Sequence, residues 1–250
     1  MRLDVLTIFP EMFKGFLSQS IIKRAQEKGL VEILLHDLRQ YTSDKHGTVD
    51  DYPYGGGPGM ILKPEPVFRA VESVQSQAPR GMVILLTPQG EQYHHRMAMS
   101  LSGEKRMLLI CGRYKGLDER IRTLADREIS IGDYVLTGGE LPAMVIIDSV
   151  VRQVPGVLGD QESAWSDSFF GGILDAPQFT RPGVFRGLRV PEVLLSGDHG
   201  QIRIWRKKEA LRRTLQRRPE ILKIISLTEE DERLIAQIQE ENRGSESAGG

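Results

Sequence analysis

The sequence IGDYVLTGGE, Ile131–Glu140, joins a short strand-like segment at residues 128–131 to the apolar run LPAMVIIDSVV. The apolar run predicts a long buried helix. Three glycines, Gly132, Gly138 and Gly139, permit backbone angles or close approaches that other residues resist. The stretch is therefore a predicted strand-to-helix loop. It is either an ordinary glycine-rich connection or a loop that wraps a flat, partly apolar ligand.

Two earlier segments repeat this design. GMVILLTPQG, residues 81–90, and RMLLICGRYKG, residues 106–116, are apolar strands that each end in a glycine-bounded turn. Strands that alternate with helices indicate an α/β domain with a parallel sheet. Ligands bind outside the carboxyl ends of such strands, so the three loops predict one ligand pocket.

The sequence contains neither GxxxxGK[ST] nor a GxGxxG motif that opens a helix after a strand. Both motifs are typical of phosphate-binding loops. The predicted ligand is therefore nucleoside-like, held by backbone groups and apolar contacts, and not a triphosphate with magnesium.

The first third of the chain predicts a strand at residues 1–9, a helix at 11–27 and a second strand at 31–38. Residues 40–63 show no periodicity and contain YGGGPGM at 54–60. A connection of this length in a compact domain indicates an ordered, ligand-facing loop.

Composition narrows the class of protein. The chain has 250 residues and a single cysteine, Cys111, which excludes an internal disulfide and a cysteine-based zinc site. The five histidines show no metal-ligand spacing. We expect no membrane span and no signal peptide, and therefore a cytoplasmic protein.

The second part of the chain predicts a separate domain. We expect a first domain at residues 1–157, a partly mobile linker at 158–172 and a small, mostly helical domain at 173–250. The formal charge of −1 argues against a uniformly basic nucleic-acid binder, yet residues 203–218 hold eight cations and one acid, Glu209. This run of cations is either a solvated helix face or a surface that contacts nucleic-acid phosphates, and the second interpretation is favoured. A disordered tail is expected from residue 243.

The motifs YGGGPGM, TPQG, CGRYxG, DER, IGDYVLTGGELPAM, PGVLG, DSF, LDxPxxTRP and LLSGxH, followed by a basic RxW helix, occur in this order. This order closely resembles the bacterial tRNA (guanine-N1)-methyltransferase family of the TrmD type. The resemblance covers nearly the whole chain and is specific because nine motifs agree in order.

The resemblance implies a SPOUT-type parallel sheet with a deep trefoil knot, an exception to the rule against knotted connections. It implies S-adenosylmethionine as methyl donor, a homodimer, and guanosine at tRNA position 37 as substrate. The implied donor-binding residues lie in the three loops: Leu86, Thr87, Pro88, Gly90, Gly112, Ser130, Ile131, Gly132, Asp133, Tyr134, Val135, Leu136, Gly138, Gly139 and Pro142.

By the same resemblance Asp167, of the DSF motif, is the base that removes the proton from guanine N1. Arg152 binds the guanine and stabilises the charge on O6. The family commonly has Glu where this chain has Lys115. Either Lys115 points away from the donor, or another acid such as Asp133 or Glu140 supplies the charge. No metal ligand is predicted, and a need for Mg²⁺ is left open.

Two other functions remain alternatives at this point. One is another knotted RNA methyltransferase that acts on a ribose 2′-hydroxyl or a ribosomal base. The other is a non-catalytic tRNA-binding protein that retains the cofactor loops for structure.

Overall fold

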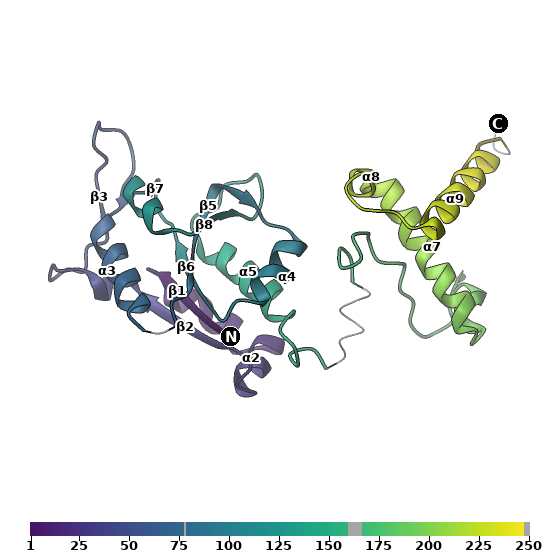
Figure 1. Cartoon of the computed structure of the whole chain (residues 1–250), viewed down its shortest axis with the longest axis horizontal. Coiled ribbons are helices and arrows are strands. Elements are labelled where there is room, and N and C mark those ends of the chain that lie inside the picture. Colours follow the sequence, from purple (N-terminus) through teal and green to yellow (C-terminus); the bar gives the residue numbers. More distant parts are fainter. Residues whose placement is uncertain (78, 160–166, 248–250) are drawn as a thin grey trace. The chain divides into compact units, whose positions relative to one another are not determined.

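The computed structural model describes residues 1–77, 79–159 and 167–247. The chain divides into two compact units, Met1–Gln161 and Glu162–Gly250 (Figure 1). Residues 160–166 of the expected linker lie outside the described residues.

The first unit is built on a five-stranded parallel sheet in the order β2-β1-β6-β5-β8. Its strands are β1 (Arg2–Thr7), β2 (Glu32–Asp37), β5 (Met82–Gln92), β6 (Arg106–Cys111) and β8 (Arg127–Ser130). The parallel sheet predicted from the alternation of strands and helices is therefore confirmed.

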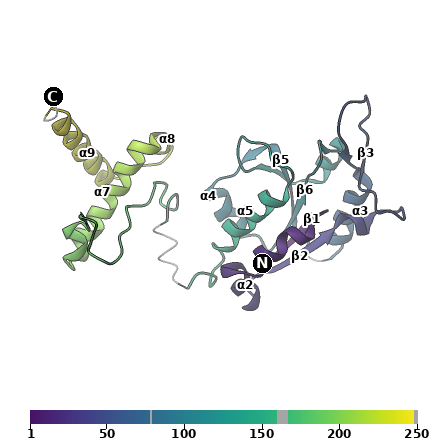
Figure 2. The same cartoon turned by 180° about the vertical axis from the view of Figure 1, so that it is seen from behind.

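Helices cover both faces of this sheet (Figures 1 and 2). On one face lie α2 (Ser20–Glu27), α4 (His95–Ser102) and α5 (Glu140–Val151). On the other face lie α3 (Pro64–Gln75) and the short 3₁₀ helices η2 (Leu38–Tyr41) and η3 (Glu119–Leu124). The unit thus has three layers, with the sheet between two layers of helices, and its central strands are buried on both faces.

The side chains of β6 show how the sequence produces these layers. Met107 and Leu109 belong to the core beneath α5, whereas Leu108 and Ile110 belong to the core beneath α3. Successive strand residues point to opposite faces, so a continuous apolar run fits a strand covered on both sides.

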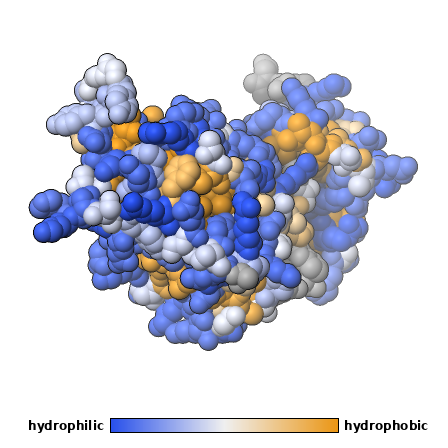
Figure 3. Space-filling model, turned by 60° about the vertical axis from the view of Figure 1, so that its left-hand side comes forward, coloured by the Kyte–Doolittle hydropathy of each residue, from blue (hydrophilic) through white to orange (hydrophobic). Residues whose placement is uncertain are grey.

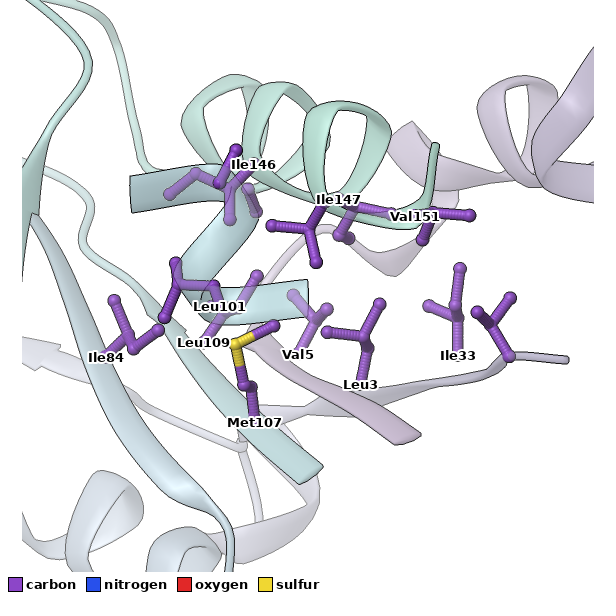
Figure 4. Packing of buried hydrophobic residues seen from close by; sticks show 14 of the residues in the cluster. Leu3, Val5, Ile33, Ile84, Leu101, Met107, Leu109, Ile146, Ile147 and Val151 are labelled. Carbon is purple, nitrogen blue, oxygen red and sulfur yellow. The ribbon is translucent and has the colours of Figure 1, made fainter. Parts of the chain in front are cut away.

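Helix α5 is the largest apolar contributor to its layer. Ile146, Ile147 and Val151 point down onto the sheet side chains (Figure 4). All three are fully buried, and each contributes roughly 1.5–3 kcal/mol by leaving water. This burial holds α5 against the face of the sheet.

The irregular region at residues 40–63 is tied down by a second, three-stranded sheet. It consists of β3 (Asp50–Asp51), β4 (Ile61–Leu62) and β7 (Gly116–Leu117), with β4 parallel to β7. The long loop is therefore attached to the turn that follows β6.

The predicted single helix at 11–27 is wrong. The chain instead forms η1 (Pro10–Phe13) and α1 (Lys14–Leu17), and α2 begins only at Ser20, whose φ is +52°. The Ser18 hydroxyl donates to the carbonyl oxygen of Gly15 at 3.2 Å. Serine side chains compete in this way with the helical backbone pattern, which the apolar spacing alone does not reveal.

The second unit contains the long helices α7 (His199–Arg217) and α9 (Glu229–Ser247), joined by α8 (Pro219–Leu222). They bury Leu211, Leu234 and Ile238 between them. Before α7 come a hairpin of β9 (Val184–Phe185) and β10 (Leu188–Arg189) and the 3₁₀ helix η4 (Glu192–Leu195). The tail expected to be disordered from residue 243 is helical through Ser247. No helix among the described residues is long and apolar enough to cross a membrane.

Candidate functional site

The three predicted ligand loops lie side by side because β6, β5 and β8 are neighbours in the sheet. The strand pairing shifts where Leu86 and Glu91 both face Ile129, so Thr87–Gly90 bulges out of the ladder. The amide of Gly139 donates to the carbonyl oxygen of Gly112 at 2.8 Å. The expectation that these loops meet at one edge is confirmed.

Two glycines of these loops are required by contacts between the loops themselves. A Cβ on Gly139 would lie 2.6 Å from Cys111 Cα, and a Cβ on Gly90 would lie 2.6 Å from the carbonyl oxygen of Glu128. Both neighbours are backbone atoms, which cannot move aside. The sequence associated these glycines with a ligand, whereas the structure shows backbone packed on backbone.

The middle of the 131–139 loop offers groups to a ligand. Val135 is 89% exposed, and within the described part of the chain the amides of Val135 and Leu136 have no acceptor. The ring of Tyr134 lies against Gly132, whose φ of +148° favours glycine. Free amides beside apolar side chains suit a nucleoside-like ligand.

The predicted donor-binding residues differ in what they expose. Leu86, Ser130 and Gly139 are buried, so only their backbone atoms reach the edge. The exposed members are Pro88, Asp133, Tyr134 and Val135. The partly exposed members are Thr87, Gly90, Gly112, Ile131, Gly132, Leu136, Gly138 and Pro142.

Glu140 is engaged within the protein. Its side chain is 1% exposed and accepts hydrogen bonds from Arg113 Nε at 2.9 Å and from Thr7 Oγ1 at 2.7 Å. A carboxylate held by an arginine and a hydroxyl in this way is not an available acid at the loop surface. Of the two acids named as substitutes for the family's Glu, only Asp133 is exposed.

Lys115 lies along the glycine-rich loop at residues 54–60. Its amide donates to the carbonyl oxygen of Met60 at 3.1 Å. A Cβ on Gly59 would lie 3.3 Å from Lys115 Cβ, and one on Gly57 would lie 3.6 Å from Nζ. The glycines of this loop therefore leave room for the lysine side chain.

The two predicted catalytic residues belong to different units. Arg152 follows the last residue of α5, and its amide donates to the carbonyl oxygen of Asp148 at 3.2 Å. Asp167 is half-buried and begins a turn in which the amide of Phe169 donates to the carbonyl oxygen of Ile173 at 2.7 Å.

The sequence missed the residues that support the turn after Asp167. Ser168 Oγ lies 2.9 Å from Asp175 Oδ1, and Arg213 Nη1 donates to the carbonyl oxygen of Asp175 at 3.1 Å. Thr214 Oγ1 accepts from the amide of Leu174 at 3.0 Å. The sequence signal that could have indicated this support is Thr214, a threonine on the buried side of an otherwise basic helix.

Most cations of α7 are paired with acids of α9. Lys207 Nζ lies 2.8 Å from Glu230, and both Lys208 and Arg212 approach Glu241 to 2.6 Å. Acids are scarce within α7, so the local sequence does not reveal these partners. Pairing between the two helices accounts for much of the charge imbalance, and phosphate contact by the other cations remains a prediction.

Comparison with known proteins gives consistent results. Residues 1–224 match the model of a family described as tRNA (Guanine-1)-methyltransferase TrmD. A tRNA (guanine-N(1)-)-methyltransferase of Moorella thermoacetica is 59% identical, covering 95% of this chain and 96% of the relative. Relatives of the same name from Geobacillus kaustophilus and Dictyoglomus turgidum are 57% and 56% identical. They cover 96% and 97% of this chain and 99% and 98% of the relatives, respectively.

Proposed function

This chain belongs to the tRNA (guanine-1)-methyltransferase family, and from that membership we propose which of its residues carry out the reaction. The chain is a methyltransferase that modifies N1 of guanine in tRNA, with S-adenosylmethionine as the methyl donor. The proposal covers the donor site, the catalytic pair, the position of the guanosine, the knot and the dimer.

The donor site is proposed at the carboxyl ends of β5, β6 and β8. The observation that supports it most directly is the hydrogen bond between Gly139 and Gly112, because it joins two glycine loops into one surface. The free amides of Val135 and Leu136 then suit the polar edge of a nucleoside. The bound donor supplies a methyl group that its positive sulfur already activates, so the protein need not polarise it.

The protein must instead make guanine N1 a nucleophile. The neutral base carries a proton on N1, and we assign its removal to Asp167. The N1–H bond breaks and its proton goes to the carboxylate, while the N1–methyl bond forms as the bond between the methyl group and the donor's sulfur breaks. The sulfur keeps that electron pair, so the donor leaves as S-adenosylhomocysteine. Arg152 is assigned to donate to O6, where negative charge develops.

The substrate position proposed is guanosine 37, directly 3′ of the anticodon. The helical domain expected at residues 173–250, which lies within the second unit, is proposed to hold the tRNA. A need for Mg²⁺ is not part of the proposal, because the chemistry described requires only a base and a hydrogen-bond donor.

A trefoil knot is proposed for the path between β8 and α5. The chain leaves the edge strand β8, passes against Cys111 and Gly112 at the end of β6, and starts α5 there. The close approach at Gly139 is the kind of contact that a threaded segment needs.

A homodimer is proposed through α5. Leu141 and Val145 are 48% and 45% exposed and lie four residues apart, on one face of the helix. Hydrophobic residues also reach the surface elsewhere, in separate areas between hydrophilic ones (Figure 3). Two exposed hydrophobic side chains on a helix that otherwise packs in the core indicate a surface that a second copy of the chain covers.

One experiment tests the reaction and the identity of the methylated nucleotide together. The protein is incubated with labelled S-adenosylmethionine and tRNA transcripts that carry guanosine or adenosine at position 37. We expect label only with guanosine, and label in both transcripts or in neither contradicts the assignment.

Asp167→Asn should retain binding of donor and tRNA but lose most turnover, because shape is kept and basicity is lost. Glu72→Gln, an exposed carboxylate-to-amide change on α3, is the matched control and should behave as wild type. If Asp167→Asn stays near the wild-type rate at every pH, the base lies elsewhere.

A further inference from the structure

The second unit contains a surface pocket of about 350 Å³ that the donor loops do not form. Residues 177–183, the 3₁₀ helix η4 and the first half of α7 line it. Ligand pockets run from roughly 300 to 1,000 Å³, so this one has the size for a single small group. Neither Asp167 nor Arg152 lines it.

The pocket has an apolar and aromatic wall. Leu194, Leu195 and Ile202 line it together with Phe179, whose side chain is 47% exposed. The Phe179 ring centroid lies 6.4 Å from that of Trp205, with the two planes tilted by 52°. One ring supports the other and leaves aromatic surface open to a flat ligand.

Arginines surround this wall. Arg181 and Arg206 line the pocket, and the adjoining β9–β10 hairpin carries Arg186 and Arg189. Among the described residues none of the four forms an ion pair. The cations of α7 that face α9 behave differently, because acids neutralise them. Arg206 is thus a cation of α7 on the pocket side that no acid of the described residues neutralises.

Few acids oppose these arginines on the neighbouring elements. Glu192 lies on η4, and Asp198 accepts the amide of Gln201 at 3.0 Å as the N-cap of α7. Four arginines against two acids, one of which caps a helix, leave an excess of positive charge. This excess favours a polyanionic partner over a protein surface.

We propose that the pocket takes an unstacked nucleobase of the tRNA anticodon loop, a base other than the guanine that is methylated. Single-stranded loops are recognised by stacking of splayed bases on aromatic rings and guanidinium planes, with cations on the phosphates. The pocket supplies the aromatic ring, the apolar floor and the arginines. The proposal rests on the proposed function, since it takes tRNA as the substrate.

The test measures tRNA affinity and steady-state methylation with the full-length chain. Phe179→Ala and Arg206→Gln should each weaken tRNA binding and raise the KM for tRNA by roughly five- to a hundredfold. The kcat should stay within about twofold, because neither residue is assigned a part in the proton or methyl transfer. Phe179→Tyr should restore the affinity, because it keeps a stacking ring.

Matched controls separate stacking from loss of charge or folding. Arg233→Gln removes the same charge from α9, and Ile224→Ala truncates another exposed apolar side chain. Both should bind tRNA as wild type does. Thermal unfolding of every variant identifies those that merely destabilise the unit.

Anticodon stem-loops with one abasic nucleotide identify the base. At one position, the abasic nucleotide should weaken binding to the wild-type protein. It should not weaken binding to Phe179→Ala any further, because the missing base and the missing ring belong to the same contact. Unchanged affinity of both pocket variants overturns the proposal, as does an altered oligomeric state with unchanged tRNA affinity. If the wild type methylates no transcript, the proposed function is refuted instead. The binding assay measures tRNA affinity without methylation, so it still tests the pocket in that case.

Discussion

Arg113 and Glu140 form an ion pair in which Nε lies 2.9 Å from Oε2, and it joins the turn after β6 to the first residue of α5. Thr7, at the end of β1, donates to the other carboxylate oxygen at 2.7 Å. The Arg113 guanidinium also lies 4.4 Å over the ring of Phe9. Three segments are thus fixed at the edge of the sheet where the proposed donor loops meet.

Removing the charge of Glu140 should loosen this edge. Glu140→Gln keeps the shape but leaves Arg113, whose side chain is 17% exposed, without a counter-charge. Breaking a buried pair from one side costs about 3–5 kcal/mol, and partial exposure reduces this to about 2–4 kcal/mol. Urea unfolding measures the loss. A loss under about 0.5 kcal/mol, the usual range for surface substitutions, would show that the pair is not needed.

Cys111 should be inert in the folded protein. Burial raises the pKa of its thiol well above the usual range, and the nearby Glu140 carboxylate raises it further, while Arg113 opposes both. The thiolate is the reactive form, so labelling by a disulfide reagent at pH 8 should occur only on unfolding. Native protein and urea-unfolded protein are compared, and fast labelling of the native protein contradicts the assignment.

Much of the fold could be predicted because apolar periodicity records burial. The strand at residues 106–111 reads as continuous apolar sequence since both of its faces are covered, and the observed β6 has these bounds. The break at Ser18–Ser20 could not be predicted in this way. Its cause is a local hydrogen bond and a positive φ, neither of which alters the spacing of apolar residues.

The candidate site was predictable where it depends on loop order. Glycine-rich turns after three strands indicate one edge of the sheet, because parallel strands end together. The pairing of Lys208 and Arg212 with Glu241 was hidden, since the acid lies about thirty positions away on another helix. The pocket around Phe179 was hidden for the same reason, as its walls meet only in the folded unit.

Asp4 should make the stability of the first unit depend on acid pH. Burial alone raises the pKa of its carboxyl, but hydrogen bonds from His36, Arg2 and Arg106 outweigh this and lower it from 3.8 to about 2. A lowered folded pKa means stabilisation that is complete above pH 3.8 and lost as the pH falls toward 2. The shift corresponds to roughly 2 kcal/mol.

Asp4→Asn isolates this contribution. The variant should be destabilised by about 3–5 kcal/mol at pH 7, because Arg106 stays buried without its partner. The difference from wild type should shrink by roughly 1.5 kcal/mol between pH 5 and pH 2.5, because the unfolded Asp4 takes up a proton in this range while the folded carboxyl stays mostly ionised. A difference in unfolding free energy that is constant over this range rules out the lowered pKa.

The cations of α7 should divide into two groups by salt dependence. Lys208→Gln and Arg212→Gln remove partly exposed pairs with Glu241, costing about 1 kcal/mol each, and should leave the salt slope of tRNA binding unchanged. Arg217→Gln removes an exposed cation that has no ion pair among the described residues, and it should reduce the slope by about 0.7. Equal slopes for all three variants would place the phosphate contacts elsewhere.

Gly139→Ala should be far more damaging than an alanine elsewhere, because the new Cβ would lie 2.6 Å from Cys111 Cα and 2.9 Å from the amide nitrogen of Gly112. Neither backbone can yield without opening β6 from the start of α5. Gly15→Ala in α1 is the matched control, since nothing lies within 4 Å of its Cβ and alanine favours a helix by about 1 kcal/mol. Unfolding should therefore show a loss for one variant and none for the other. The donor affinity of Gly139→Ala should fall with its stability, because the contact that excludes a side chain also holds together the two loops proposed to bind the donor.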